Sequence, residues 1–402
     1  MHVLVVGASV GGIATADSLR AEGFEGRITV VEAEPHLPYD KPPLSKGALA
    51  PGWDACRGLL RPEQHYRDNR IELRLGQRVT GLDPHRTSVT LDSGERIQAD
   101  AVVLAPGLRA RHLSPESMLP GVWSVRSRDD SDGLRSALHG RPRVVIVGAG
   151  FIGVEVASAA RSLGCAVSVV ESRRAPFDGI FGSEVAQALA RRLTTHDIEL
   201  HTGVGVGSVR GHRRAEQVVL ADGTRLPADV VVLGLGATPE LGWLAGSGLD
   251  LSDGIVCDAY GRTGVPGVYA VGDVAAWWDP GAACHRRVEH WTTAKEHGAA
   301  VGYTIAHPDS VPRGVGPVPY FWSDHFGRRM QFLGTSAGHD ETTTVHGDLD
   351  TDEFVVLYGR DGMLTGALGL SAARMLAQFR VALGQRSPLD AVLNPARLGP
   401  DS

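Results

Sequence analysis

The chain has 402 residues, of which 43% are hydrophobic, and this is typical of a globular protein with about two or three domains. Its formal net charge of −6 argues against nucleic acid as a general partner. The longest apolar runs have the length of strands, and the first of them begins almost at the N-terminus, so we expect neither a transmembrane helix nor a signal peptide. Four widely spaced cysteines predict reduced thiols in a cytoplasmic protein, with no metal site.

The first predicted element is a strand, a glycine-containing turn and a helix. An apolar run over residues 3–6 leads into Gly-Ala-Ser-Val-Gly-Gly at residues 7–12, and the strand after the helix ends in Glu32. Glycines in such a turn let a pyrophosphate approach the backbone at the helix N-terminus, and the acid can accept a hydrogen bond from an adenosine ribose. We therefore predict a dinucleotide site formed by Gly7, Ser9, Gly11, Gly12 and Glu32.

A proline-rich segment follows at residues 38–46, with the sequence Pro-Tyr-Asp-Lys-Pro-Pro-Leu-Ser-Lys. Prolines disfavour a regular helix or strand, so this segment is predicted to be a rigid loop. Residues 71–104 are expected to form strands and turns, and they end before the break at Pro106-Gly107.

The same strand-turn-helix pattern occurs a second time. Residues 144–147 are apolar, Gly-Ala-Gly-Phe-Ile-Gly follows at residues 148–153, and the next strand ends in Glu171. A further strand over residues 229–234 closes this block near Gly236. Two dinucleotides held by one chain indicate redox chemistry between a flavin and a nicotinamide. The residues expected at the second site are Gly148, Gly150, Ile152, Gly153, Glu171 and Gly236.

Glu171 bears on the choice of nicotinamide cofactor. A carboxylate at this strand end accepts from the 2′-hydroxyl of NADH and repels the 2′-phosphate of NADPH. Arg173 and Arg174 follow directly and provide charges that suit NADPH instead. We favour NADH and keep NADPH as the less favoured alternative.

The last third of the chain contains one more motif and a separate block. Residues 267–273 read as a short strand ending in Gly272-Asp273, where the carboxylate either faces a cofactor or caps a helix. Residues 312–319 are predicted to be a linker. A β-rich block extends from there to about residue 369, and one short helix is expected over residues 372–383.

Five segments, taken together and in chain order, resemble the NAD(P)H-dependent ferredoxin reductases that serve oxygenases. They are residues 38–46, similar to PYDRPPLSK; residues 148–155, which contain GxIGxE; Gly272-Asp273; residues 287–291, which match RxEHW; and residues 321–325, similar to FWSDQ. In this chain Lys41 replaces an arginine and His325 replaces the glutamine.

The resemblance implies an α/β fold with two Rossmann-like dinucleotide-binding domains, arranged as in glutathione reductase, and a C-terminal α+β domain. The FAD-binding domain would comprise residues 1–110 and 242–317, the NAD-binding domain residues 111–241, and the C-terminal domain residues 318–402.

The resemblance also implies roles for individual residues. Lys46 would lie by the isoalloxazine and stabilise the negative charge of the reduced ring. Glu155 would pair with Lys46 and meet the nicotinamide, and Trp291 and Trp322 would wall the flavin. Further cofactor contacts are expected from Lys41, Val79, Ala105, Arg126, Gly272, Asp273 and Glu289.

The implied activity is transfer of electrons from NADH through FAD to an acidic ferredoxin that supplies a monooxygenase or a ring-hydroxylating dioxygenase. The chain has no cysteine pair beside the flavin segment, so electrons are expected to leave the flavin directly. The alternatives are an NADH oxidase or peroxidase using Cys56, and a redox-sensing protein similar to apoptosis-inducing factor. We expect a monomer or homodimer, and steering of ferredoxin by the pairs Arg286/Arg287 and Arg328/Arg329.

Overall fold

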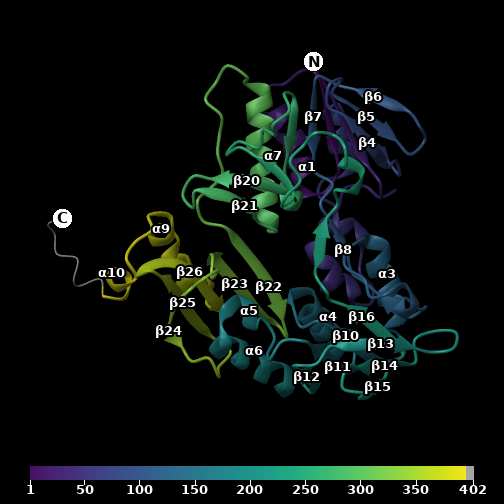
Figure 1. Cartoon of the computed structure of the whole chain (residues 1–402), viewed down its shortest axis with the longest axis vertical. Coiled ribbons are helices and arrows are strands. Elements are labelled where there is room, and N and C mark those ends of the chain that lie inside the picture. The colour runs from purple at the N-terminus through teal and green to yellow at the C-terminus, as the bar shows by residue number, and fades with distance from the viewer. Residues whose placement is uncertain (395–402) are drawn as a thin grey trace. The chain divides into compact units, whose positions relative to one another are not determined.

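The computed structural model describes residues 1–394, and these form two compact units (Figure 1). The first unit comprises Met1–Lys41, Ala55–Arg109 and Thr238–Pro319. The second comprises Pro42–Asp54, Ala110–Ala237 and the chain from Tyr320 onward. The short strands β8 (Leu108–Ala110) and β17 (Ala237–Pro239) lie where the chain passes between the units. The division into three domains stays a prediction, and residues 395–402 of its last part lie outside the described residues.

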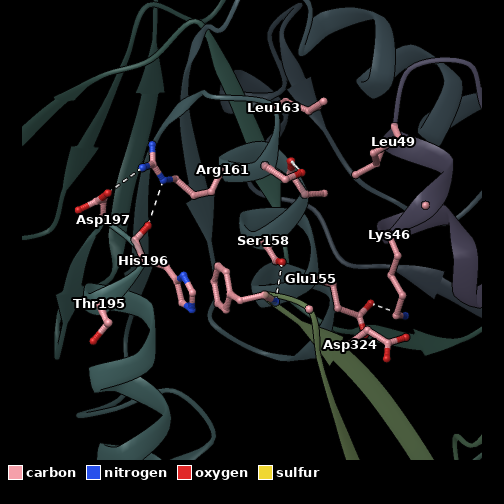
Figure 2. Close-up of a pocket in the computed structure, with 16 residues that line it drawn as sticks. Lys46, Leu49, Glu155, Ser158, Arg161, Leu163, Thr195, His196, Asp197 and Asp324 are labelled. Atoms are coloured by element: carbon pink, nitrogen blue, oxygen red, sulfur yellow. Dashed lines mark hydrogen bonds and ion pairs between the residues drawn. The ribbon is translucent and has the colours of Figure 1, made fainter. Parts of the chain in front are cut away.

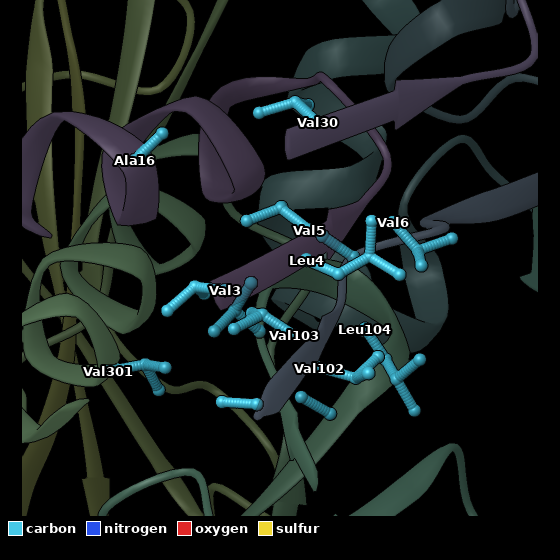
Figure 3. Close-up of a cluster of buried hydrophobic side chains, with 14 of the residues drawn as sticks. Val3, Leu4, Val5, Val6, Ala16, Val30, Val102, Val103, Leu104 and Val301 are labelled. Atoms are coloured by element: carbon cyan, nitrogen blue, oxygen red, sulfur yellow. The ribbon is translucent and has the colours of Figure 1, made fainter. Parts of the chain in front are cut away.

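The first unit is built on a parallel sheet of five strands in the order β19-β7-β1-β2-β3. Its central strands are apolar along their whole length, as expected for strands that are covered on both faces. Val3, Leu4 and Val5 are fully buried, and Figure 3 shows them among the neighbouring side chains of the core. The strands are β1 (His2–Val6), β2 (Arg27–Glu32), β3 (Ile71–Leu75), β7 (Ala101–Leu104) and β19 (Val268–Ala270).

Helices and two smaller sheets complete this unit. Helix α1 packs against α7, and a Cβ added to Gly298 of α7 would lie 2.3 Å from the carbonyl oxygen of Gly11, so the two backbones approach closely (Figure 1). The helices are α1 (Val10–Ala21), α2 (Glu63–Asp68) and α7 (Trp291–Ala306). The small sheets contain β4 (Val79–Asp83), β5 (Ser88–Leu91) and β6 (Arg96–Gln98), and β18 (Ile255–Cys257), β20 (Ala275–Asp279) and β21 (Cys284–Arg287).

The second unit contains another parallel sheet of five strands, in the order β12-β11-β10-β16-β9. The strands are β9 (Val122–Trp123), β10 (Arg143–Val147), β11 (Ala166–Glu171), β12 (Ile198–Thr202) and β16 (Val230–Leu233). The helices of this part are α3 (Arg128–Ala137), α4 (Phe151–Ser162), α5 (Asp178–Phe181) and α6 (Ser183–Thr195). An antiparallel sheet is formed by β13 (Val206–Arg210), β14 (Gln217–Leu220) and β15 (Arg225–Pro227).

The C-terminal part of the second unit is an antiparallel sheet in the order β22-β23-β26-β25-β24. Its apolar face shares a core with α4, because Phe321 and Phe332 pack against Phe151 and Phe181. The strands are β22 (Tyr320–His325), β23 (Arg328–Gly334), β24 (Glu341–Gly347), β25 (Phe354–Arg360) and β26 (Met363–Leu370).

Two local predictions are wrong. Residues 372–383 form two helices, α8 (Ala373–Ala377) and α9 (Phe379–Gly384), followed by α10 (Leu389–Leu393). The backbone of Gln378 donates to Met375, three residues back, and this tight turn interrupts the helical hydrogen bonds. The proline-rich loop contains a 3₁₀ helix at Pro42–Ser45, because the fixed φ of proline is compatible with the first turn of a helix.

The predicted fold class is confirmed: the described chain contains two parallel sheets with crossover helices and a C-terminal antiparallel sheet with short helices. Among residues 1–394, no helix is both long enough and apolar enough to cross a membrane.

Candidate functional site

The first glycine turn joins β1 to α1 in the first unit. Gly7 has φ +104°, and a Cβ there would lie 2.1 Å from the carbonyl oxygen of Ala105. A Cβ on Gly12 would lie 1.9 Å from the carbonyl oxygen of Gly7. Ser9 is the N-cap of α1 and its side chain forms no capping hydrogen bond. The first amides of α1 therefore keep the donor capacity that a phosphate uses at a helix N-terminus.

The acid at the end of β2 is bound to this turn. Glu32 Oε2 accepts from the backbone N–H of Ala8 at 2.7 Å, and Oε1 accepts from the backbone N–H of Glu34 at 3.1 Å. Glu34 itself pairs with Lys41 at 2.9 Å. Glu32 is thus the acid that lies at the turn, and each of its oxygens retains a lone pair that can accept from a ribose hydroxyl.

The Gly-Asp motif lies beside the same turn, although it is about 260 residues away in the sequence. A Cβ on Gly11 would lie 3.7 Å from the Cα atom of Gly272. Gly272 has φ +76° and begins a 3₁₀ turn in which Asp273 is the second residue. The structure therefore brings the two predicted motifs of the first unit together.

The remaining predicted residues of the first unit have varied surroundings. Val79 is buried in the core, and Ala105 follows β7, where its backbone N–H donates to Val6. Glu289 forms an ion pair with Arg287. Trp291 is the first residue of α7, and its indole Nε1–H donates to Asp40 at 2.6 Å. The glycine turn, Glu32 and the Gly-Asp motif fit the pyrophosphate and ribose of a dinucleotide.

The second glycine turn, between β10 and α4, repeats the geometry of the first. Gly148 has φ +101°, and a Cβ there would lie 2.4 Å from the carbonyl oxygen of Gly234. A Cβ on Gly153 would lie 2.0 Å from the carbonyl oxygen of Gly148, whereas a Cβ on Gly150 would meet nothing within 4 Å. This turn of the second unit also fits a dinucleotide pyrophosphate.

Glu171 occupies the position that Glu32 has in the first unit. Its Oε2 accepts from the backbone N–H of Ala149 at 2.9 Å, and its Oε1 accepts from the backbone N–H of Arg173 at 2.9 Å. Ile152 is 41% exposed in the first turn of α4, and Gly236 has φ +79° beyond the end of β16. Arg126 precedes α3 and its backbone N–H donates to the side chain of Asp130.

Lys46 and Glu155 form an ion pair within the second unit. The Nζ atom of Lys46 lies 2.8 Å from Glu155 Oε2, and the two side chains are 18% and 3% exposed, respectively. Nζ also donates to the carbonyl oxygen of Pro42 at 3.0 Å. Both residues line a cavity of about 640 Å³ that extends along α4 to Asp197 (Figure 2). The predicted pairing of the two side chains is therefore present.

The segment that carries Lys46 is anchored on α3. Ser131 Oγ donates to the carbonyl oxygen of Leu44 at 2.8 Å, and Arg135 Nη1 donates to that of Ala48 at 3.0 Å. These contacts hold the backbone on either side of Lys46, so its ammonium group reaches Glu155 from a fixed position.

Two serines donate to Glu155 and a histidine contacts one of them, and none of the three was predicted as a site residue. Ser45 Oγ donates to Glu155 Oε2, Ser323 Oγ donates to Oε1, and Ser323 Oγ lies 2.8 Å from His325 Nε2. Burial and the nearby Lys46 lower the pKa of His325 to about 3. Ser45 lies in the segment at residues 38–46, and Ser323 and His325 lie in the segment at residues 321–325, so membership of these two segments was the signal that could have identified them.

Trp322 lies on β22 and stacks on Tyr320 with ring centroids 6.0 Å apart and an interplanar angle of 23°. All four cysteines are free: Cys165 and Cys257 are buried, and Cys56 and Cys284 are exposed. Within residues 1–394, no group of three or more histidine, cysteine or acidic side chains is arranged to hold a metal ion.

Comparison with known proteins agrees with this geometry. The family model described as pyridine nucleotide-disulphide oxidoreductase matches residues 1–298, and the model described as reductase C-terminal matches residues 320–395. The chain is 37% identical, over 99% of its own length and 95% of the relative, to the ferredoxin reductase component of chlorobenzene dioxygenase from Cupriavidus sp. (strain PS12).

A second relative is the ferredoxin–NAD(+) reductase subunit of the benzene 1,2-dioxygenase system from Pseudomonas putida, with 35% identity over 94% of this chain and 90% of the relative. Among solved structures, the putidaredoxin reductase–putidaredoxin covalent complex matches with a TM-score of 0.93 and 27% identity, over 99% of both chains.

Proposed function

Because the chain belongs to the pyridine nucleotide-disulphide oxidoreductase family, and within it to the ferredoxin reductases, we propose that it is an NADH:ferredoxin oxidoreductase of an oxygenase system. The observation that carries this proposal is the pair of matching glycine turns, each with a carboxylate bound to its second residue. When bound, FAD accepts a hydride from NADH and releases single electrons.

Some of the chain's residues would bind the two cofactors, and others would stabilise charge at the reacting ring. In this proposal the first turn and Glu32 hold FAD, together with Gly272 and Asp273. The second turn and Glu171 hold NADH. Lys46 stabilises negative charge at the reacting ring, and Glu155 balances that lysine and orients the nicotinamide carboxamide.

The proposed electron acceptor is an acidic iron–sulfur ferredoxin that feeds a monooxygenase or ring-hydroxylating dioxygenase. Two oxygenase-system reductases similar to this chain along nearly its whole length support this assignment. All four cysteines are free thiols, and thiols stay reduced in the cytoplasm, so they support our proposal that the enzyme is cytoplasmic. Trp291 and Trp322 are proposed to border the flavin.

A panel of electron acceptors tests the proposal. Purified enzyme loaded with FAD is given NADH or NADPH together with ferredoxin and cytochrome c, with cytochrome c alone, with hydrogen peroxide, or with a small disulfide. We expect rapid cytochrome c reduction that requires ferredoxin and prefers NADH. Peroxide turnover that is lost in Cys56→Ser would instead identify a peroxidase. A long-lived reduced form that changes its oligomeric state, without ferredoxin reduction, would identify a redox sensor.

A further inference from the structure

Ser323, which donates to Glu155, comes from the C-terminal sheet, not from the nucleotide-binding part of the second unit. Ser323 and His325 are two residues apart on β22, so their side chains share one face of the strand. Both are buried, at 1% and 3% exposed. The turn between β22 and β23 is fixed to α4, because the backbone N–H of Phe326 donates to Ser158 Oγ at 2.8 Å.

The number of protons available decides the direction of each hydrogen bond. The carboxylate of Glu155, paired with the Lys46 ammonium, can only accept. The single hydroxyl proton of Ser323 is therefore given to Glu155, and Ser323 Oγ must accept from His325 Nε2. This order requires a proton on Nε2, which a neutral imidazole carries only in its Nε2–H tautomer.

The surroundings of His325 hold the ring in this state. The ring of Phe177 stacks on the imidazole of His325, with ring centroids 6.1 Å apart and an interplanar angle of 18°. Burial is the main cause that lowers the pKa of His325 to about 3, and the charged groups acting on it are Lys46, Arg192 and Asp324. The imidazole therefore stays neutral at the pH of the cytoplasm and remains a donor to Ser323.

We propose that His325, acting through Ser323, is a positioning residue that holds the Glu155 carboxylate in place toward Lys46. This inference rests on the proposed role of Glu155 in hydride transfer from NADH. It gives the C-terminal sheet a direct part in that site, since one oxygen of Glu155 takes its hydrogen bond from β22 and the other from Ser45 and Lys46.

Three variants separate positioning from packing. Ser323→Ala removes the donor to Glu155, His325→Leu removes the donor to Ser323, and His325→Gln keeps an N–H donor in a neutral side chain. We expect Ser323→Ala to slow anaerobic reduction of FAD by NADH about tenfold, the effect of one hydrogen bond to a charged group, and His325→Leu to slow it roughly threefold, the effect of one hydrogen bond between neutral groups. His325→Gln should recover most of that loss. His346→Leu, at a surface imidazole of the same sheet, is the matched control.

Rescue by the conservative variant gives a readout that lost packing alone does not move. Glutamine restores a neutral N–H donor to Ser323 but not the shape of the imidazole ring, so recovery of the rate of FAD reduction in His325→Gln follows the hydrogen bond. Wild-type rates of FAD reduction in all three variants, or a His325→Gln rate as low as that of His325→Leu, would overturn the proposal.

The tautomer can be observed without any turnover. Nitrogen-15 NMR of the histidine side chains, with the His325 signals assigned by their loss in His325→Gln, should show a neutral ring protonated on Nε2. We expect this state between about pH 6 and pH 8, well above the lowered pKa of this buried ring. A ring protonated on Nδ1, or a charged ring, would overturn the proposal. If NADH fails to reduce FAD in the wild-type enzyme, the proposed function fails, whereas the tautomer measurement still decides the hydrogen-bond order.

Discussion

Lys46 is the only cation that forms an ion pair with Glu155 in the described part of the chain, and the carboxylate is almost completely buried. A buried charge that loses its partner is costly, and Ser45 and Ser323 would then be the remaining donors to it. The residue that is proposed to stabilise the reduced ring therefore also stabilises the neighbouring acid.

Lys46→Ala should slow FAD reduction in the protein that still folds and binds FAD. Loss of one positive charge beside the reacting ring should cost about 2–3 kcal/mol, or roughly 30–150-fold in rate. The measurement is stopped-flow reduction by NADH in protein that is shown to be folded and loaded with FAD. Arg374→Ala, at an exposed arginine of α8, is the control, and a wild-type rate in Lys46→Ala would exclude the proposed role.

Glu171 should make NADH the better donor. Its carboxylate is fixed by two backbone amides at the end of β11, where it would accept from a 2′-hydroxyl and repel a 2′-phosphate. Glu171→Ala should narrow the preference measured as the ratio of kcat/KM for NADH and NADPH. If the wild-type enzyme is already more efficient with NADPH, then Arg173 or Arg174 reads a phosphate and the assignment is wrong.

At the scale of elements, each glycine turn joins a parallel strand to a helix through a close backbone contact. The third residue of each turn has room for a side chain. This residue is Ser9 in the first turn and Gly150 in the second, where an added Cβ would meet nothing within 4 Å. The last glycine of each turn has no such freedom, since a Cβ on Gly12 or Gly153 would meet a carbonyl oxygen.

Gly153→Ala should therefore destabilise the second unit, and Gly150→Ala should not. A backbone atom lies 2.0 Å from the added Cβ at Gly153 and must shift, whereas the space around Gly150 is open. We expect Gly153→Ala to lower the thermal unfolding midpoint by about 5 °C, the effect of roughly 2 kcal/mol of overpacking. Equal midpoints for the two variants would show that the turn relaxes around the new methyl group.

Helix α7 and strand β22 carry buried histidines that should make stability depend on pH. Burial lowers the pKa of His297, which stacks on Trp277, to about 3, and that of His325 to about 3. Burial and Arg286 lower the pKa of His290 to about 4. These pKa values lie below the usual histidine pKa of about 6.5. At a pH between the lowered and the usual pKa values, the unfolded chain therefore binds more protons than the folded chain. The free energy of unfolding should therefore fall as the pH falls below about 6.5.

Urea unfolding at pH 7 and pH 5 (about one and a half units below the usual histidine pKa) checks this expectation, since most carboxylates stay ionised there. The wild-type midpoint should be lower at pH 5, and His297→Phe, which keeps an aromatic ring against Trp277, should reduce the difference. A midpoint that does not change with pH would show that these histidines titrate normally.

The sequence was sufficient to predict the elements whose pattern is local. Both glycine turns, the acids at the ends of β2 and β11 and the C-terminal β-rich block follow from glycine spacing and apolar runs. The hydrogen bonds of Ser323 to Glu155 and of Ser45 to Glu155 join residues 168 and 110 positions apart, and no local pattern encodes them.

At the scale of the whole molecule, the charge is negative and the arginine pairs offer little unopposed positive charge. Arg286 pairs with Asp279, Arg328 with Asp352 and Arg329 with Asp324, each at 2.8 Å, and Arg287 pairs with Glu289. The opposite charges of such pairs largely cancel each other's field beyond about 8–10 Å. Steering of an acidic ferredoxin by these arginines stays a prediction, and their ion pairs argue that its effect is small.

Electrons are proposed to pass from NADH through bound FAD to a ferredoxin, and a sequential-mixing experiment follows both transfers. FAD-loaded enzyme is first mixed anaerobically with NADH, and the reduced enzyme is then mixed with an oxidised iron–sulfur ferredoxin. We expect rapid bleaching of the flavin absorbance, followed by its recovery as the ferredoxin is reduced. Flavin that NADH does not bleach, or a reduced enzyme that gives no electrons to any ferredoxin tested, would show that the chain does not carry electrons from NADH to a ferredoxin.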